Sequence, residues 1–106
     1  MPLEVENLYR GSTSSGGRET IQRLLQTDAV RIERIDSHAE SSPEGFWYDQ
    51  SQHEWVILLQ GSATLALAEG QRLELKAGDY LLVPPHCKHR VECTSADALW
   101  LAVHFR

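Results

Sequence analysis

The alternation of short apolar runs with turn-forming residues constrains the fold of this 106-residue chain more than any other feature. From residue 30 onward, short stretches rich in branched and aromatic side chains are separated by Gly, Pro, Asp and Ser. We expect strands at residues 30–35, 54–59, 62–67, 80–83, 90–94 and 98–105, with shorter extended pieces at 47–48 and 73–75. Many short strands with closely spaced turns are typical of an all-β sandwich or barrel.

The N-terminal part departs from this pattern. Residues 1–17 are polar and rich in Gly and Ser, which predicts a flexible arm. In residues 18–26, the apolar side chains Ile21, Leu24 and Leu25 have the spacing of one short amphipathic helix. A chain of this length builds one hydrophobic core, so we expect a single domain over residues 18–106.

Charge and composition exclude several function classes. Fifteen acidic residues against ten basic ones give a net charge of −5, which argues against a nucleic-acid partner. The N-terminus has no signal-peptide pattern and no apolar run could span a membrane, so we expect a cytoplasmic protein with no membrane partner. Cys87 and Cys93 have no zinc-type spacing, and we expect each to act as a small buried hydrophobe.

Two spacings in the second half of the chain are more specific. Glu54 is followed by six residues and then Gly61. Gly78 is followed by five residues and then Pro84, with His89 shortly after. These spacings resemble the two motifs of the cupin superfamily, over roughly residues 32–105. The runs at 47–50, 54–56 and 100–105 are similar to a bacterial subgroup of small single-domain cupins. The resemblance implies a double-stranded β-helix (jelly-roll) barrel, here with a short N-terminal helix.

The resemblance also implies a metal site inside the barrel. Cupin motifs typically supply three imidazoles and one carboxylate, which bind a divalent metal and leave positions open for a substrate or water. Only Glu54 and His89 carry over from that set. The paired histidines are replaced by Trp47 and Asp49, or by Tyr48 and Gln50, depending on whether four or three residues separate the pair from the motif glutamate.

Other side chains can complete such a site. Asp49 is a plausible ligand because a carboxylate oxygen can replace an imidazole nitrogen. The full candidate set is Asp49, Glu54, His86, His89 and His104. These nitrogen and oxygen donors suit Zn, Mn, Fe, Ni or Co without choosing among them. Two histidines and one carboxylate on one face would resemble the facial triad of non-haem iron oxygenases, and a bound metal can activate water or polarise a substrate oxygen.

Each candidate also has a structural alternative. Glu54 can be the polar residue that starts a strand, and His89 can be a buried structural histidine. Asp49 lies in a polar stretch where aspartate forms turns. His86 can be a ligand, an acid or base of the pocket, or a loop residue. His104 can face either side of the last strand.

These observations lead to two hypotheses about function. The first is a metal-dependent cupin enzyme that acts on a small organic molecule, by dioxygenase, isomerase, decarboxylase or lyase chemistry. The second is a non-catalytic cupin that binds a small ligand, either metal-free or with a structural metal. Because residues 54–59 are apolar on both faces, the outer face needs a cover from the N-terminal helix or from a second subunit, and we predict a homodimer.

Overall fold

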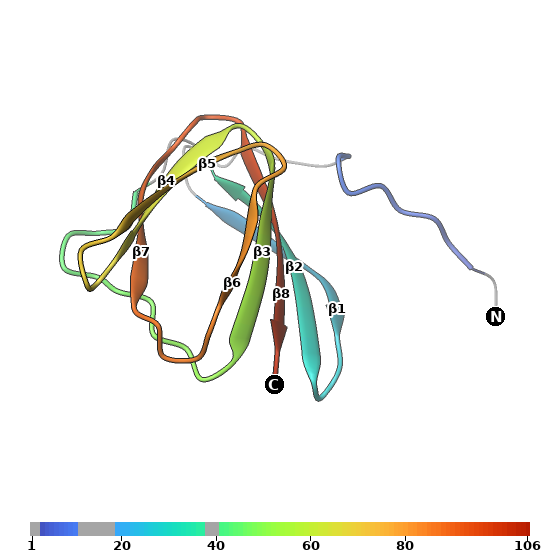
Figure 1. The fold of residues 1–106 in the computed structure, drawn as a ribbon. Helices are drawn as coiled ribbons and strands as arrows, with labels where there is room; N and C mark the ends of the chain where they lie inside the picture. Colours follow the sequence, from blue (N-terminus) through green and yellow to red (C-terminus); the bar gives the residue numbers. More distant parts are fainter. Residues whose placement is uncertain (1–2, 11–18, 38–40) are drawn as a thin grey trace.

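The computed structural model describes residues 3–10, 19–37 and 41–106, and every regular element in them is a β-strand. The eight strands are β1 (Thr20–Gln26), β2 (Val30–Ser37), β3 (His53–Gln60), β4 (Ser62–Leu67), β5 (Arg72–Lys76), β6 (Tyr80–Val83), β7 (His89–Thr94) and β8 (Ala98–Phe105). They form a five-stranded sheet in the order β1-β2-β8-β3-β6 and a three-stranded sheet in the order β5-β4-β7. All the pairings are antiparallel, and the sheets curve around one interior (Figure 1).

The predicted all-β barrel is confirmed. Strands β4, β6 and β8 begin and end where the sequence pattern places them, and β2, β3, β5 and β7 differ from it by one or two residues at an end. The extended piece expected at residues 47–48 is only an isolated bridge, from Tyr48 to His89. Of the predicted flexible arm, residues 3–10 lie to one side of the barrel (Figure 1), and residues 1–2 and 11–17 lie outside the described part of the chain. The described residues contain no helix that could cross a membrane.

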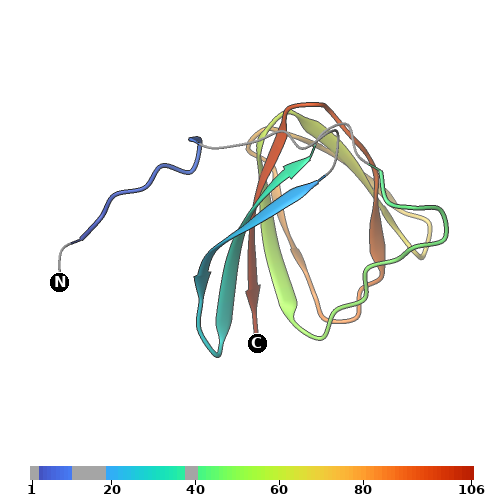
Figure 2. The same cartoon turned by 180° about the vertical axis from the view of Figure 1, so that it is seen from behind.

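The predicted N-terminal helix is wrong, because residues 20–26 form strand β1 at the edge of the larger sheet. Seen from behind (Figure 2), β1 and β2 form a hairpin at one side of that sheet. The register shifts between Arg23 and Leu25, and such a bulge interrupts the two-residue alternation of a strand. Ile21 and Leu25 are about half exposed, so the helix-like spacing corresponds to no buried helical face.

The core is formed by the inward-facing side chains of both sheets. Leu58 of β3 is fully buried, and Trp100 and Ala102 of β8 are 5% and 0% exposed. The indole nitrogen of Trp100 donates a hydrogen bond to the hydroxyl of Ser37 at 3.1 Å, so its polar group is satisfied. Burial of a leucine-sized side chain contributes about 1.5–3 kcal/mol, which makes this layer the main stabilising part of the barrel.

The two cysteines behave differently from each other. Both are free thiols, Cys87 partly buried and Cys93 exposed. The prediction of a small buried hydrophobe is therefore wrong for Cys93. Its partner across the sheet is Thr64, and the register of β4 and β7 shifts directly after this pair. The shift changes which side chains of β7 face the interior.

Candidate functional site

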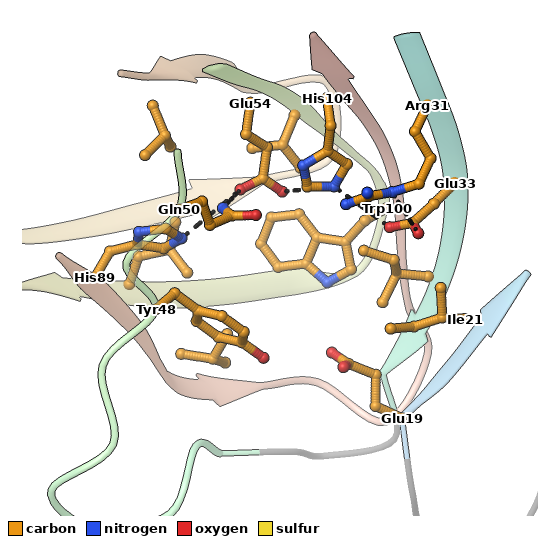
Figure 3. Close-up of a pocket in the computed structure, with 15 residues that line it drawn as sticks. Glu19, Ile21, Arg31, Glu33, Tyr48, Gln50, Glu54, His89, Trp100 and His104 are labelled. Atoms are coloured by element: carbon orange, nitrogen blue, oxygen red, sulfur yellow. Dashed lines mark hydrogen bonds and ion pairs between the residues drawn. The ribbon is translucent and has the colours of Figure 1, made fainter. Parts of the chain in front are cut away.

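A cavity of about 270 Å³ lies inside the barrel, toward the end where β3 begins and β8 finishes (Figure 3). Polar and apolar side chains share its wall. The lining residues are Glu19, Ile21, Arg31, Glu33, Ile35, Tyr48, Gln50, Glu54, Val56, Leu65, Val83, His89, Val91, Trp100 and His104.

Strand register explains why the polar side chains of the larger sheet meet. Arg31 of β2 pairs with His104 of β8, and His104 pairs with Glu54 of β3. Directly paired residues of antiparallel strands project from the same face, so these three side chains form one row across the cavity wall. The direction of His104, which the sequence left open, is inward, as for Trp100 and Ala102.

Glu54 lies at the centre of the polar wall, with its side chain 12% exposed. The Gln50 amide nitrogen donates a hydrogen bond to Glu54 Oε1 at 2.9 Å. His89 Nε2 lies 3.7 Å from the same oxygen, and His104 Nε2 lies 3.9 Å from Glu54 Oε2. One buried carboxylate is therefore contacted by an amide and by two imidazoles.

His89 presents a lone pair to the cavity. Its Nδ1 lies 2.9 Å from the carbonyl oxygen of Cys87, and because a carbonyl only accepts, Nδ1 carries the proton and donates it. In the neutral ring, Nε2 is then an acceptor that faces Glu54. The ring of Tyr48 stacks on the imidazole at 5.4 Å between centroids, with 26° between the planes. Two backbone hydrogen bonds between Tyr48 and His89 hold the two rings in this arrangement.

His104 has the opposite assignment. Its Nε2 lies 3.3 Å from Glu33 Oε1, and an ionised carboxylate only accepts, so this nitrogen carries the proton. Its Nδ1 is buried and has no hydrogen-bond partner among the described residues. Glu33 also forms an ion pair with Arg31, at 3.0 Å between Nε and Oε2. His104 is thus committed as a donor toward Glu33.

The structure decides between the two replacements for the paired histidines of the family motif. Tyr48 and Gln50 line the cavity beside Glu54 and His89, which is the alternative with three intervening residues. Asp49 is not among the lining residues. A phenol and an amide therefore stand where typical cupins place two imidazole ligands.

These residues do not fit the metal site of a typical cupin. A metal-binding histidine normally donates its second ring N–H to an acceptor, an arrangement that His89 has and His104 lacks. Within residues 3–10, 19–37 and 41–106, no group of three or more His, Cys, Asp or Glu side chains is arranged to hold a metal ion. Of the side chains next to Glu54, Gln50 forms a hydrogen bond with it, and His89 and His104 lie 3.7 and 3.9 Å away.

The five predicted metal ligands fall into two groups. Glu54, His89 and His104 line the cavity, whereas Asp49 and His86 do not. Asp49 Oδ1 and His86 Nδ1 are 2.7 Å apart, in a pair whose side chains are 40% and 68% exposed. His86 has a φ of 60°, in the left-handed region that favours glycine.

Three charged residues of the cavity were missed from the sequence, namely Glu19, Arg31 and Glu33. Arg31 and Glu33 alternate with Ile35 on one face of β2. That two-residue spacing is the signal that could have placed them inside. Glu19 directly precedes β1, where a helix was expected, so its position could not be inferred.

The described strands form an eight-stranded, double-sheet barrel with an internal cavity. The model of the cupin domain family matches residues 31–104, and this chain belongs to that family. No curated protein is similar enough to count as a match.

Solved structures give the same fold. A protein from Ralstonia eutropha JMP134, provisionally named mannose-6-phosphate isomerase, is 39% identical with a TM-score of 0.90, covering 97% of this chain and 98% of that one. A cupin superfamily protein from Desulfitobacterium hafniense DCB-2 is 21% identical with a TM-score of 0.75, covering 88% and 82%. The Fe(II) form of HppE is 17% identical with a TM-score of 0.72, covering 83% and 50%. The last two similarities concern the fold alone.

Proposed function

We propose that this protein is a cupin that binds a small polar organic molecule in its barrel cavity through its own side chains, without a metal ion. The observation that carries the proposal is the hydrogen bond from Gln50 to Glu54, 2.9 Å long, at the place where a typical cupin has a metal ligand. The Gln50 amide nitrogen donates to the Glu54 carboxylate. In this proposal, Glu54 is therefore held by a hydrogen bond, whereas in a typical cupin it would bind the metal.

The lining has the composition of a ligand-binding cavity. Val56, Leu65 and Trp100 supply apolar surface, and Glu54 and His89 supply polar groups in fixed positions. Ligand sites generally combine a mostly apolar wall with a few polar groups that orient the ligand. Glu54 and His89 would accept hydrogen bonds from the ligand, and the Tyr48 ring would contact its apolar part.

A divalent metal such as Zn, Mn, Fe, Ni or Co, which the family resemblance implies, is not part of this proposal. We expect protein purified without a histidine tag to contain less than about 0.1 equivalent of any transition metal, because two imidazole ligands are replaced. Elemental analysis by mass spectrometry measures this. One equivalent of metal in the wild type, lost in both Glu54→Gln and His89→Ala, would contradict the proposal.

The binding function is tested by a thermal-shift screen of small metabolites. A ligand that binds only the folded protein stabilises it by about 2.7 kcal/mol at a concentration of 100 times Kd. We expect a stabilising ligand for the wild type and a much smaller shift in Glu54→Gln. Glu74→Gln is the matched control, since Glu74 is exposed on β5 and outside the cavity lining. Equal shifts in wild type and Glu54→Gln would place the ligand elsewhere.

A second candidate is an isomerase that moves a proton with its own side chains. It is favoured by the 3.7 Å contact between His89 Nε2 and Glu54 Oε1 inside the cavity, and by the provisional isomerase name of the Ralstonia relative. His89 would accept a proton from the carbon next to a substrate carbonyl, the C–H electron pair would pass into the carbonyl as an enolate, and His89 would return the proton to the neighbouring carbon. Glu54 would stabilise the transient imidazolium. Exchange of a substrate C–H with D₂O, followed by NMR, tests this. Exchange that persists at the wild-type rate in His89→Gln would exclude it.

We also propose a homodimer formed through the outer face of the five-stranded sheet. Tyr80 and Leu82 of β6 are 64% and 53% exposed on this face, beside Trp55. Strand β1 extends the sheet at its edge and does not cover the face, which leaves a second subunit as the expected cover. Light scattering should give twice the monomer mass for the wild type and the monomer mass for Leu82→Lys. A monomeric wild type at micromolar concentration would contradict the proposal.

A further inference from the structure

The described wall of the cavity carries more negative than positive charge. Three carboxylates line it, from Glu19, Glu33 and Glu54, against the single guanidinium of Arg31. Arg31 lies 3.0 Å from Glu33 and not beside Glu54 (Figure 3). The one arginine of the wall is therefore already paired.

Glu54 lacks a permanent counter-charge. Its contacts are to Gln50, His89 and His104, and in the part of the chain that the structure describes no lysine or arginine forms an ion pair with it. An imidazole supplies a full positive charge only when it is protonated. A carboxylate that is 12% exposed and lacks a full counter-charge is costly to bury, and a bound cation would lower that cost.

Several hydrogen-bond donors of the wall are used within the protein. His104 Nε2 contacts Glu33 at 3.3 Å, and the Trp100 indole donates to Ser37. The Gln50 amide nitrogen donates to Glu54, and His89 Nδ1 donates to a backbone carbonyl. Apart from the guanidinium of Arg31, the groups around Glu54 that remain toward the cavity are acceptors, including the Nε2 lone pair of His89. A ligand that brings donors therefore suits this side of the wall.

The size and the aromatic surface of the cavity narrow the ligand further. A volume of about 270 Å³ is just below the usual range for ligand sites, roughly 300–1,000 Å³, so the ligand is small. Tyr48 and Trp100 border the same space as Glu54 (Figure 3). The faces of aromatic rings attract cations, and the attraction grows when the site is desolvated.

We infer that the ligand is a small hydroxylated amine, which brings one positive charge together with several N–H and O–H donors. The inference rests on the proposed function and names the ligand class of the same cavity. It differs from the phosphorylated sugar in the provisional name of the Ralstonia relative. A phosphate group brings about 1.5–2 negative charges near pH 7 and only acceptor oxygens, both unsuited to the side of the wall formed by Glu54 and His89.

The test compares three probes that share one scaffold and differ in charge: mannosamine, mannose and mannose 6-phosphate. Binding is measured by titration calorimetry and by NMR chemical shifts. We expect mannosamine to bind about tenfold more tightly than mannose, and mannose 6-phosphate to bind more weakly than either. The preference for mannosamine should shrink as NaCl is raised, because salt screens the charge contribution.

Two variants, each lacking one carboxylate charge, test whether Glu54 causes the preference for mannosamine over mannose. Glu54→Gln keeps the shape of the side chain and removes its charge, so mannosamine should bind this variant no better than mannose does. Glu74→Gln removes a charge on the exposed side of β5 and should keep the wild-type preference. Circular dichroism confirms that both variants are folded.

Three results would overturn the inference: mannosamine failing to bind the wild type, mannose 6-phosphate binding at least as tightly as mannosamine, or the preference surviving in Glu54→Gln. The failure of the proposed function looks different. In that case no probe or screened metabolite shifts the NMR signals of Tyr48, His89 or Trp100. Tighter binding of the neutral or anionic probe with shifts at those residues would reject only the ligand class.

Discussion

Strands β3 and β8 pair along nearly their whole length, but their inward-facing side chains are apolar at one end and polar at the other. At one end, Leu58 and Ala98 are 0% and 2% exposed, in a core formed by both sheets. At the other end, the same inward alternation presents Glu54 and His104 to a cavity. Strand pairing therefore sets which side chains face the interior of the barrel. The identity of a few of those side chains decides whether the interior is packed or contains a cavity.

The two ends also differ in what they contribute to stability. The apolar end gains from close packing, where loss of even one methylene is felt. The polar end retains a buried carboxylate that no arginine or lysine of the described chain pairs with, which costs stability and is typical of a binding site. Substitutions at the two ends should therefore differ in size and in sign.

The largest effect is expected at the apolar end. Leu58→Ala removes a fully buried side chain and leaves a cavity, and we expect the free energy of unfolding to fall by about 2–5 kcal/mol. Urea denaturation followed by circular dichroism measures the loss. A loss below about 1 kcal/mol would show that this layer is not the main source of stability and would contradict the proposed difference between the two ends.

A smaller effect is expected at the turn that leads from β3 to β4. Gly61 has a φ of +83°, and a Cβ there would lie 2.3 Å from the hydroxyl of Ser95 and 3.0 Å from Ala98 Cα. We expect Gly61→Ala to lower the free energy of unfolding by about 1–3 kcal/mol.

Gly70→Ala is the matched control for this turn, because Gly70 has a φ of +110° and no atom within 4 Å of an added Cβ. Its cost in the same urea assay should be smaller than that of Gly61→Ala. Equal losses in the two variants would show that backbone conformation alone, and not the close approach to Ser95, determines the effect.

The smallest effect is expected at the polar end, and in the opposite direction. Glu54→Gln removes a buried charge but keeps the shape of the side chain, so the free energy of unfolding should stay within about 1 kcal/mol of the wild type or rise. The same urea titration measures it in the absence of ligand. A loss comparable to that of Leu58→Ala would show instead that Glu54 is a structural residue that stabilises the fold.

Much of the barrel could be predicted because short strands with clear turns have a local signature. The bounds of β4 and β6 follow from the apolar pattern and from the glycines and the proline near their ends, and those of β8 follow from its apolar run. Strand β1 could not be recognised, because the register shift between Arg23 and Leu25 produces a helix-like spacing.

The residues of the site that could be predicted with most specificity are those at the fixed spacings of the family motifs. Glu54 and His89 were found from the family motifs, and both line the cavity. The replacement of the paired histidines by Tyr48 and Gln50 depends on how the loop before β3 is held, which no local pattern reveals. Glu33 reaches His104 through the long-range pairing of β2 with β8, and a single sequence does not specify such a pairing.

The backbone bridge between Tyr48 and His89 affects the conformational entropy that binding of the proposed ligand would cost. The backbone amides of Tyr48, His86 and His89 donate hydrogen bonds across the two loops that border the cavity, at 2.7, 2.7 and 3.2 Å. These hydrogen bonds hold both segments in the free protein, so binding of the proposed ligand would lose little conformational entropy there. We expect the amides of Tyr48 and His89 to exchange slowly with solvent deuterium in the free protein, and to gain little further protection when the cavity is filled.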